Sequence, residues 1–150
     1  MKKFKFRMQT ILEIREKKLD DERLKLAEIQ NILNSQLDIL NEMQFKRQEI
    51  VGKIDALQAQ PEMNIPEIVA LRNYLERVQS DIQTQLELIK RTQIRLDEQK
   101  IEVENAYKDL KSLENLKEKQ EKEHYRNILM MEAKEIDDIA ISRYKGDNKK

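Results

Sequence analysis

The sequence predicts an all-α protein, an antiparallel two-helix coiled-coil hairpin whose second helix is longer and projects beyond the first. Three observations predict this fold: a composition rich in charged helix formers, two long runs of apolar residues with heptad spacing, and a short stretch between them that holds both prolines. We expect a single domain over residues 1–150. It would consist of a first helix over about 5–58, a bend over 59–65, a second helix over about 66–144 and a loose tail over 145–150.

The composition favours long helices over a globular core. Charged residues make up 39% of the chain and aromatic residues 5%, with two glycines, no tryptophan and no cysteine. Such a balance is typical of coiled coils. The formal net charge is zero, which argues against whole-chain attraction to nucleic acid or to an anionic membrane. No apolar run approaches the roughly 20 residues that cross a bilayer.

Each predicted helix carries an apolar seam with alternating steps of three and four residues. Ten of fourteen positions are apolar in the first seam, which comprises Leu12, Arg15, Leu19, Glu22, Leu26, Ile29, Leu33, Gln36, Leu40, Met43, Arg47, Ile50, Ile54 and Leu57. Ten of thirteen are apolar in the second, which comprises Leu71, Leu75, Val78, Ile82, Gln85, Ile89, Thr92, Leu96, Gln99, Val103, Ala106, Leu110 and Leu113. Seams this long indicate a coiled coil, in which buried polar positions such as Gln36, Arg47, Gln85 and Gln99 commonly set the register.

The chain is expected to turn back between Gln58 and Pro66. Two prolines this close together disfavour one continuous helix, while Asn64 and Glu67 have the spacing of a capping box that starts a new one near Ile65. In a hairpin centred near residue 62, facing residue numbers add up to about 125, so both seams run out at the same level. An antiparallel dimer of straightened chains would produce the same match.

Some apolar side chains have no predicted partner within the hairpin. After a polar stretch over 117–127, the second helix regains a stripe formed by Ile128, Leu129, Met131, Ile136, Ile139 and Ala140. An unpaired amphipathic helix is poorly stable alone, so this stripe favours a binding partner. A second set flanks the seams and indicates either a wide seam or a docking patch: Ile32, Leu37, Ile39, Val51, Leu86 and Leu88.

No catalytic, cofactor or metal constellation is present in the sequence, so we expect a protein that is not an enzyme and binds no cofactor or metal. The single histidine, His124, lies in the polar stretch and is predicted to be a solvated side chain. The acidic clusters Asp20 to Glu22 and Glu135 to Asp138 are interpreted as helix surface or partner contacts. The basic start with Phe4 and Phe6 would suit nucleic acid only weakly, because the patch is short.

Several of these residues together resemble the FliJ family of the flagellar type III export apparatus. The resemblance spans nearly the whole chain, from Phe4-Lys-Phe6-Arg7 and Leu12, through the bend and Tyr74, to Leu116-Lys-Glu-Lys119, Glu132 and Ile136-Asp137-Asp138. It implies an antiparallel coiled coil similar to the central stalk of rotary ATPases. It also implies a protein that acts at the flagellar base, in the cytoplasm and peripherally at the inner membrane.

The resemblance further implies three kinds of partner, and no nucleic acid. The paired ends would enter the hexameric export ATPase ring and promote its assembly and activity, while the other half would contact the cytoplasmic domain of the export gate and escort substrate chaperones. Gate contacts fall on Gln36, Leu40, Met43, Tyr74 and Val78. For the ring we predict Lys17, Lys18, Asp20, Asp21, Arg23, Ile128, Met131, Ile136 and Ile139.

Two other interaction functions compete with this prediction. One is the analogous stalk of a virulence type III secretion system. The other is a generic coiled-coil tether or a prefoldin-like holdase, although the short linker leaves no room for the β-hairpins of prefoldin.

Overall fold

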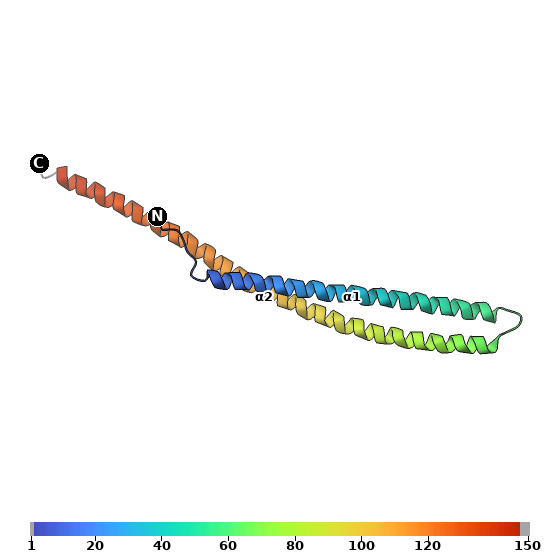
Figure 1. Cartoon of the computed structure of the whole chain (residues 1–150). Coiled ribbons are helices and arrows are strands. Elements are labelled where there is room, and N and C mark those ends of the chain that lie inside the picture. The colour runs from blue at the N-terminus through green and yellow to red at the C-terminus, as the bar shows by residue number, and fades with distance from the viewer. Residues whose placement is uncertain (1, 148–150) are drawn as a thin grey trace. The chain divides into compact units, whose positions relative to one another are not determined.

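The protein consists of two long helices, α1 (Gln9–Gln58) and α2 (Ile65–Asp147), which pack antiparallel (Figure 1). A computed structural model describes residues 2–147. The chain divides into two units, one formed by Met1–Asp20 with Glu104–Lys150 and the other by Asp21–Val103. Each unit contains a part of both helices, and each is described by itself. The fold class predicted from the sequence is confirmed, including the greater length of the second helix.

The turn between the helices is built as the prolines and the capping residues predict. The Glu67 amide donates to the Asn64 carboxamide oxygen (3.3 Å), and the Asn64 amide group donates back to the Glu67 carboxylate (3.2 Å). This reciprocal pair satisfies donors at the first turn of α2, where Pro66 needs no hydrogen-bond acceptor. Within the described residues there is no cis peptide bond.

The ends of the helices differ from the expected bounds. α1 begins at Gln9 and not near residue 5, because Lys2, Lys3, Lys5 and Arg7 would repel the positive end of a helix dipole. At the other end α2 continues through Gly146 to Asp147, past the expected end near residue 144. A glycine ends a helix readily when its backbone is left-handed, and Gly146 is not. The rest of the predicted loose tail, residues 148–150, lies outside the described residues.

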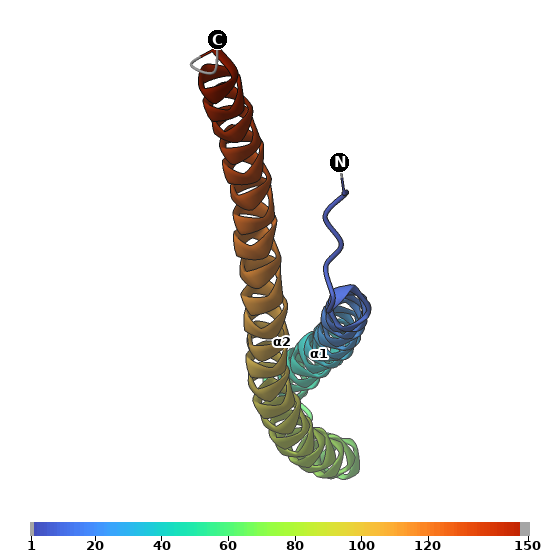
Figure 2. The same ribbon diagram turned by 90° about the vertical axis from the view of Figure 1, so that its left-hand side faces the viewer.

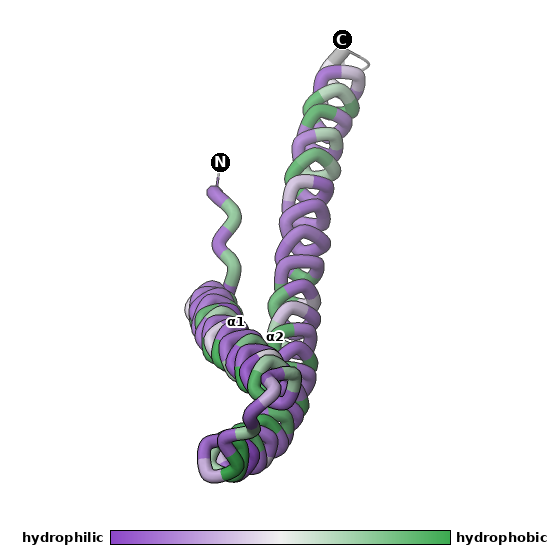
Figure 3. The backbone as a smooth tube through the Cα atoms, turned by 90° about the vertical axis from the view of Figure 1, so that its right-hand side faces the viewer, coloured by the Kyte–Doolittle hydropathy of each residue, from purple (hydrophilic) through white to green (hydrophobic). Residues whose placement is uncertain are grey.

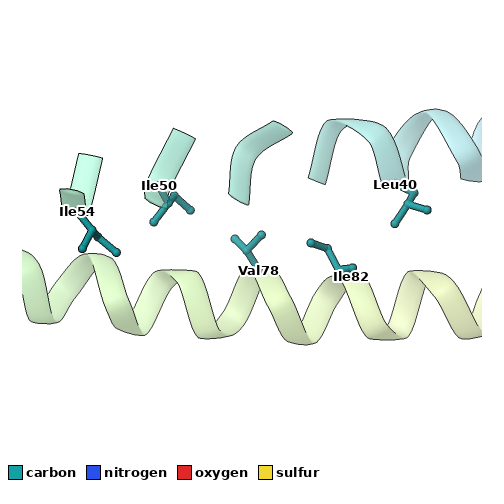
Figure 4. Packing of buried hydrophobic residues seen from close by; sticks show 5 residues of the cluster. All are labelled: Leu40, Ile50, Ile54, Val78 and Ile82. Carbon is teal, nitrogen blue, oxygen red and sulfur yellow. The ribbon is translucent and has the colours of Figure 1, made fainter. Parts of the chain in front are cut away.

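The core of the Asp21–Val103 unit is the predicted seam. Its larger cluster joins Leu40, Ile50 and Ile54 of α1 to Val78 and Ile82 of α2 (Figure 4). A second cluster joins Ile29 and Leu33 to Leu96, which is only 3% exposed. Arg47 is the exception, because its side chain is exposed although it occupies a seam position. Its long side chain reaches water past the open side of a two-stranded seam.

The other unit carries the outer part of the same seam. Leu12 and Leu19 of α1 and Ala106, Leu110 and Leu113 of α2 are all buried. Among the residues that the structure describes, no side chain is less than 2% exposed, as expected of two helices that cover each other from one side only.

Polar bridges fix the antiparallel register in both units. Each is a hydrogen bond from a side chain of one helix to the other helix or, for His124, to the segment before α1. The pairs are Gln85–Gln36 (2.9 Å), Gln99–Glu22 (3.0 Å), Arg15–Asp109 (2.9 Å), Lys117–Gln9 (2.8 Å) and His124–Lys2 (3.0 Å). The residue numbers of every pair add up to within about one helical turn of the expected 125. The register predicted from the two seams is therefore the one that forms.

Candidate partner-binding surfaces

The first surface begins with an N-terminal arm, residues 2–8, which lies against the part of α2 beyond the start of α1 (Figures 1 and 2). The Phe6 side chain is buried, with 8% exposed, and Phe4 is half-buried. The Phe4 ring lies 5.7 Å from the His124 ring, measured between centroids. A turn closed by the Phe6 carbonyl and the Gln9 amide (3.1 Å) then leads into α1.

His124 holds the other end of this arm, and the prediction of a solvated side chain is wrong. Its Nε2 lies 3.0 Å from the Lys2 carbonyl oxygen, and its half-buried ring contacts the Phe4 ring and makes a T-shaped contact with the Tyr125 ring. Since a carbonyl oxygen only accepts, Nε2 must carry the proton and donate. In the polar stretch only Lys117 and His124 are half-buried, so the arm covers the one side of α2 that carries these two residues.

Two signals in the sequence point to this contact. Phe4 and Phe6 alternate with basic residues, which is the period of an extended segment with one apolar side. His124 falls on the continuation of the second seam, two heptads after Leu110. The alternation at Phe4 and Phe6 was not interpreted as an extended segment, because the helical pattern of the following residues led to a predicted helix start near residue 5.

Beyond the arm, α2 carries apolar residues, which are green in Figure 3, and several large ones are exposed. Leu129, Met131, Ile136 and Ile139 are each 55–67% exposed, while Ile128 is half-buried. At about 100° per residue these side chains do not share one face. Met131 lies on the side of His124, whereas Leu129 and Ile136 lie about 120–140° around the helix axis from it.

The predicted charged contacts are all accessible. Lys17, Lys18 and Asp20 are exposed in the unit that holds the arm, and Asp21 and Arg23 are exposed in the other. All five side chains are therefore accessible to a binding partner. Nothing in the structure shows a partner on them, so this role stays a prediction.

The five positions predicted to contact the export gate come together next to the larger core cluster. Leu40 and Val78 belong to this cluster (Figure 4). Met43 and Tyr74 pack against it. Gln36 is half-buried, and its side-chain oxygen accepts no hydrogen bond within the described chain. Most of this set is therefore occupied within the hairpin, and its accessible part is the face around Tyr74.

Two cations lie close to the ring of Tyr74. The Lys46 ammonium lies 5.9 Å and the Arg77 guanidinium 5.5 Å from its centroid, which suits cation–π attraction. The apolar residues that flank the seams in this unit are exposed as expected, at 39–43% for Ile32, Leu37, Ile39, Val51, Leu86 and Leu88. This unit therefore exposes apolar side chains beside its seam as well as two cations near Tyr74.

Residues 2–147 contain no group of three or more histidine, cysteine or acidic side chains placed to hold a metal ion. No helix in the same residues is long and apolar enough to cross a membrane. Asp20, Asp21 and the cluster from Glu135 to Asp138 are exposed, as interpreted from the sequence, whereas Glu22 is half-buried in the seam, where Gln99 donates to it.

These features define a class: an antiparallel two-helix coiled coil with exposed apolar and charged helix faces. The family model described as Flagellar FliJ protein matches residues 4–149. The chain belongs to the flagellar FliJ family and is a non-enzymatic component of flagellar protein export. No match was found among curated proteins or among solved structures. The resemblance inferred from the sequence is thereby confirmed over nearly the whole chain.

Proposed function

We propose that this protein binds the centre of the export ATPase ring, promotes the assembly and activity of the ring, and links it to the export gate and to substrate chaperones. The observation that carries the proposal is the unpaired end of α2, whose apolar side chains remain exposed after both the hairpin and the arm have formed. A helix face of this kind is stabilised by a partner. The setting of the partners would be the cytoplasmic face of the inner membrane at the flagellar base.

The ring contact uses the exposed charges Lys17, Lys18, Asp20, Asp21 and Arg23 together with the apolar end of α2. Two helices in antiparallel contact have no six-fold symmetry, so they meet the subunits of a hexamer unequally. Unequal contacts would favour different nucleotide states in different subunits.

The gate contact uses the surface near Tyr74. Leu40 and Val78 contribute by holding this surface in place, since both are more than nine-tenths buried. Met43, Tyr74 and Gln36 would then meet the gate with their accessible parts. Chaperones would use the neighbouring apolar flanks of the seams.

The test compares three forms of the chain in co-purification with the export ATPase and in ATP hydrolysis. Full-length protein should bind and stimulate, and a chain that ends at Lys122 should do neither. Since that truncation also removes His124, a chain that ends at Asn127 serves as the control, because it keeps the contact with the arm and lacks only the apolar end. Loss in both truncated chains supports the proposal, while binding by the chain that ends at Asn127 contradicts it.

A further inference from the structure

In the described chain, Lys117 is the last residue of α2 that forms a hydrogen bond with α1. Its ammonium donates to the side-chain oxygen of Gln9, the first residue of α1 (2.8 Å). Beyond this point α2 continues through residues 118–146, in which only His124 and Ile128 are not exposed. An isolated helix with so little cover is only marginally stable.

The N-terminal arm supplies a second support one heptad further along α2. His124 lies seven residues after Lys117 and therefore on the same side of the helix. Its Nε2 donates to the Lys2 carbonyl oxygen (3.0 Å), and its ring lies 5.7 Å from that of Phe4. The Phe6 side chain, nearer to α1, is buried. The arm thus extends the supported length of α2 by about 10 Å.

The charged side chains of the arm take no part in this contact. Lys3, Lys5 and Arg7 alternate with the two phenylalanines and are exposed, as the two-residue period of an extended segment requires. Among the described residues, none of these three cations forms an ion pair. The rings and the Lys2 carbonyl therefore hold the arm on α2, so its exposed charges can be changed without releasing it.

Support at His124 matters for the apolar end of α2 because helix formation is cooperative. A residue near the end of a helix stays helical only while the turns between it and the nearest support are helical. Ile136 lies 12 residues beyond His124 and 19 beyond Lys117. Loss of the arm therefore lengthens the unsupported helix before Ile136, and lowers the fraction of molecules in which this side chain lies on a formed helix.

We infer that the N-terminal arm is a positioning segment for the apolar end of α2. Its contact with His124 keeps the turns that carry Ile136 and Ile139 helical, and the buried Phe6 ring keeps the arm in place. A partner that binds only the helical form binds more weakly when fewer molecules have that form, so the arm raises the affinity without touching the partner. The inference rests on the proposed function in that this end binds the export ATPase ring. It adds a segment outside that contact which sets the strength of the contact.

Phe6→Ala in the full-length chain tests both parts of the inference. The substitution removes the ring that anchors the arm and keeps all of its basic side chains. Hydrogen exchange over residues 128–139 should accelerate, and the affinity for purified export ATPase should fall about three- to thirtyfold. The seam over residues 26–50 should exchange as before, which shows that the chain is still folded. Unchanged exchange over 128–139, or binding as tight as that of the unmodified chain or tighter, would overturn the inference.

A matched variant separates positioning from direct contact. Lys3→Ala with Lys5→Ala removes two exposed charges of the arm and leaves both rings in place. Because the arm acts through α2, this variant should bind the ATPase as the unmodified chain does. If it weakens binding as much as Phe6→Ala, the arm touches the partner itself and the inference is wrong.

A rescue variant gives a readout that a direct contact of the arm would not change. Asn127 is exposed in α2 between His124 and Ile136, and asparagine is a poorer helix former than alanine. In the Phe6→Ala background, Asn127→Ala should therefore restore the affinity about two- to threefold. In the unmodified chain, where these turns are already helical, it should change the affinity less. Absence of any rescue would contradict the inference.

The inference and the proposed function fail separately in these measurements. If the unmodified chain does not bind the ATPase, the proposed function fails, and the exchange of residues 128–139 still decides whether the arm keeps this end helical. If the chain binds the ATPase and Phe6→Ala binds it equally well, the proposed function stands and the inference fails.

Discussion

Replacing Phe6 with alanine should release the N-terminal arm and expose the side of α2 that carries Lys117 and His124. Phe6 is the only arm residue whose side chain is buried, and its carbonyl closes the turn into α1. Alanine keeps that backbone bond and removes the ring. The effect should therefore fall on the arm and on residues 117–124 of α2, and spare the rest of the hairpin.

The magnitude follows from the burial of the ring. Full burial of a phenylalanine side chain contributes about 1.5–3 kcal/mol, and Phe6 is 8% exposed. The Phe4–His124 contact adds about 0.5–1.5 kcal/mol, which is lost if the arm detaches. A fall of about 2 kcal/mol in the free energy of local opening accelerates amide exchange about thirtyfold.

Hydrogen exchange followed by mass spectrometry measures this change segment by segment. Exchange should accelerate over residues 117–124 and remain constant over 26–50. Phe45→Ala is the matched control, because the Phe45 ring is 64% exposed and its removal should change neither segment. Unchanged exchange of residues 117–124 in Phe6→Ala would refute the assignment of the arm as their cover.

Three further predictions concern stability, each measured by urea unfolding with circular dichroism. Gly52→Ala should raise the free energy of unfolding by about 0.5–1 kcal/mol, since Gly52 lies inside α1 and an added Cβ meets nothing within 4 Å; a decrease would show a contact that the structure lacks. Leu96→Ala should cost about 2–5 kcal/mol because Leu96 is 3% exposed in its cluster, whereas Leu24→Ala, at 61% exposed, should cost under about 0.5 kcal/mol. Gln85→Leu should stabilise by about 1 kcal/mol, since apolar burial in the seam outweighs one hydrogen bond to the Gln36 carbonyl; destabilisation would mean that the hydrogen bond outweighs it.

Periodicity was sufficient to predict the hairpin, because a two-stranded coiled coil uses one repeating contact. The seam from Leu12 to Leu57 is buried or half-buried at every position except Arg47. Pairing this seam with the second seam predicts the register of the two helices. The hydrogen bonds from Gln85 and Gln99 to α1 occur in that register. Capping was equally predictable, since the Asn64–Glu67 pair depends only on residues three apart.

Contacts that break the helical period were not predictable in the same way. The arm packs on α2 in an extended conformation, so its apolar residues recur every second position and not every third or fourth. His124 was interpreted from its charged neighbours, but its environment depends on residues more than a hundred positions away in the chain. The sequence around His124 therefore does not show that the N-terminal arm contacts it.

The candidate surfaces were predicted better as regions than as residue sets. The exposed apolar end of α2 was predicted, but Met131 does not share the face of Ile136. On the bend-proximal side, the positions implied by resemblance to the family include Leu40 and Val78, which the hairpin itself buries. Resemblance to the family predicts the region in which a contact occurs. The burial of each side chain determines which atoms are accessible to the partner.

The central claim is that the chain folds back on itself in one antiparallel register, and a single cysteine pair tests it most directly. The sequence contains no cysteine, so Leu33→Cys with Leu96→Cys introduces only the pair that lies within one core cluster. Oxidation should give an internal disulfide in monomers at every protein concentration, while Leu33→Cys with Val78→Cys, displaced by about 27 Å along α2, should give none. Disulfide-linked dimers in place of closed monomers, or equal closure of both pairs, would contradict the account.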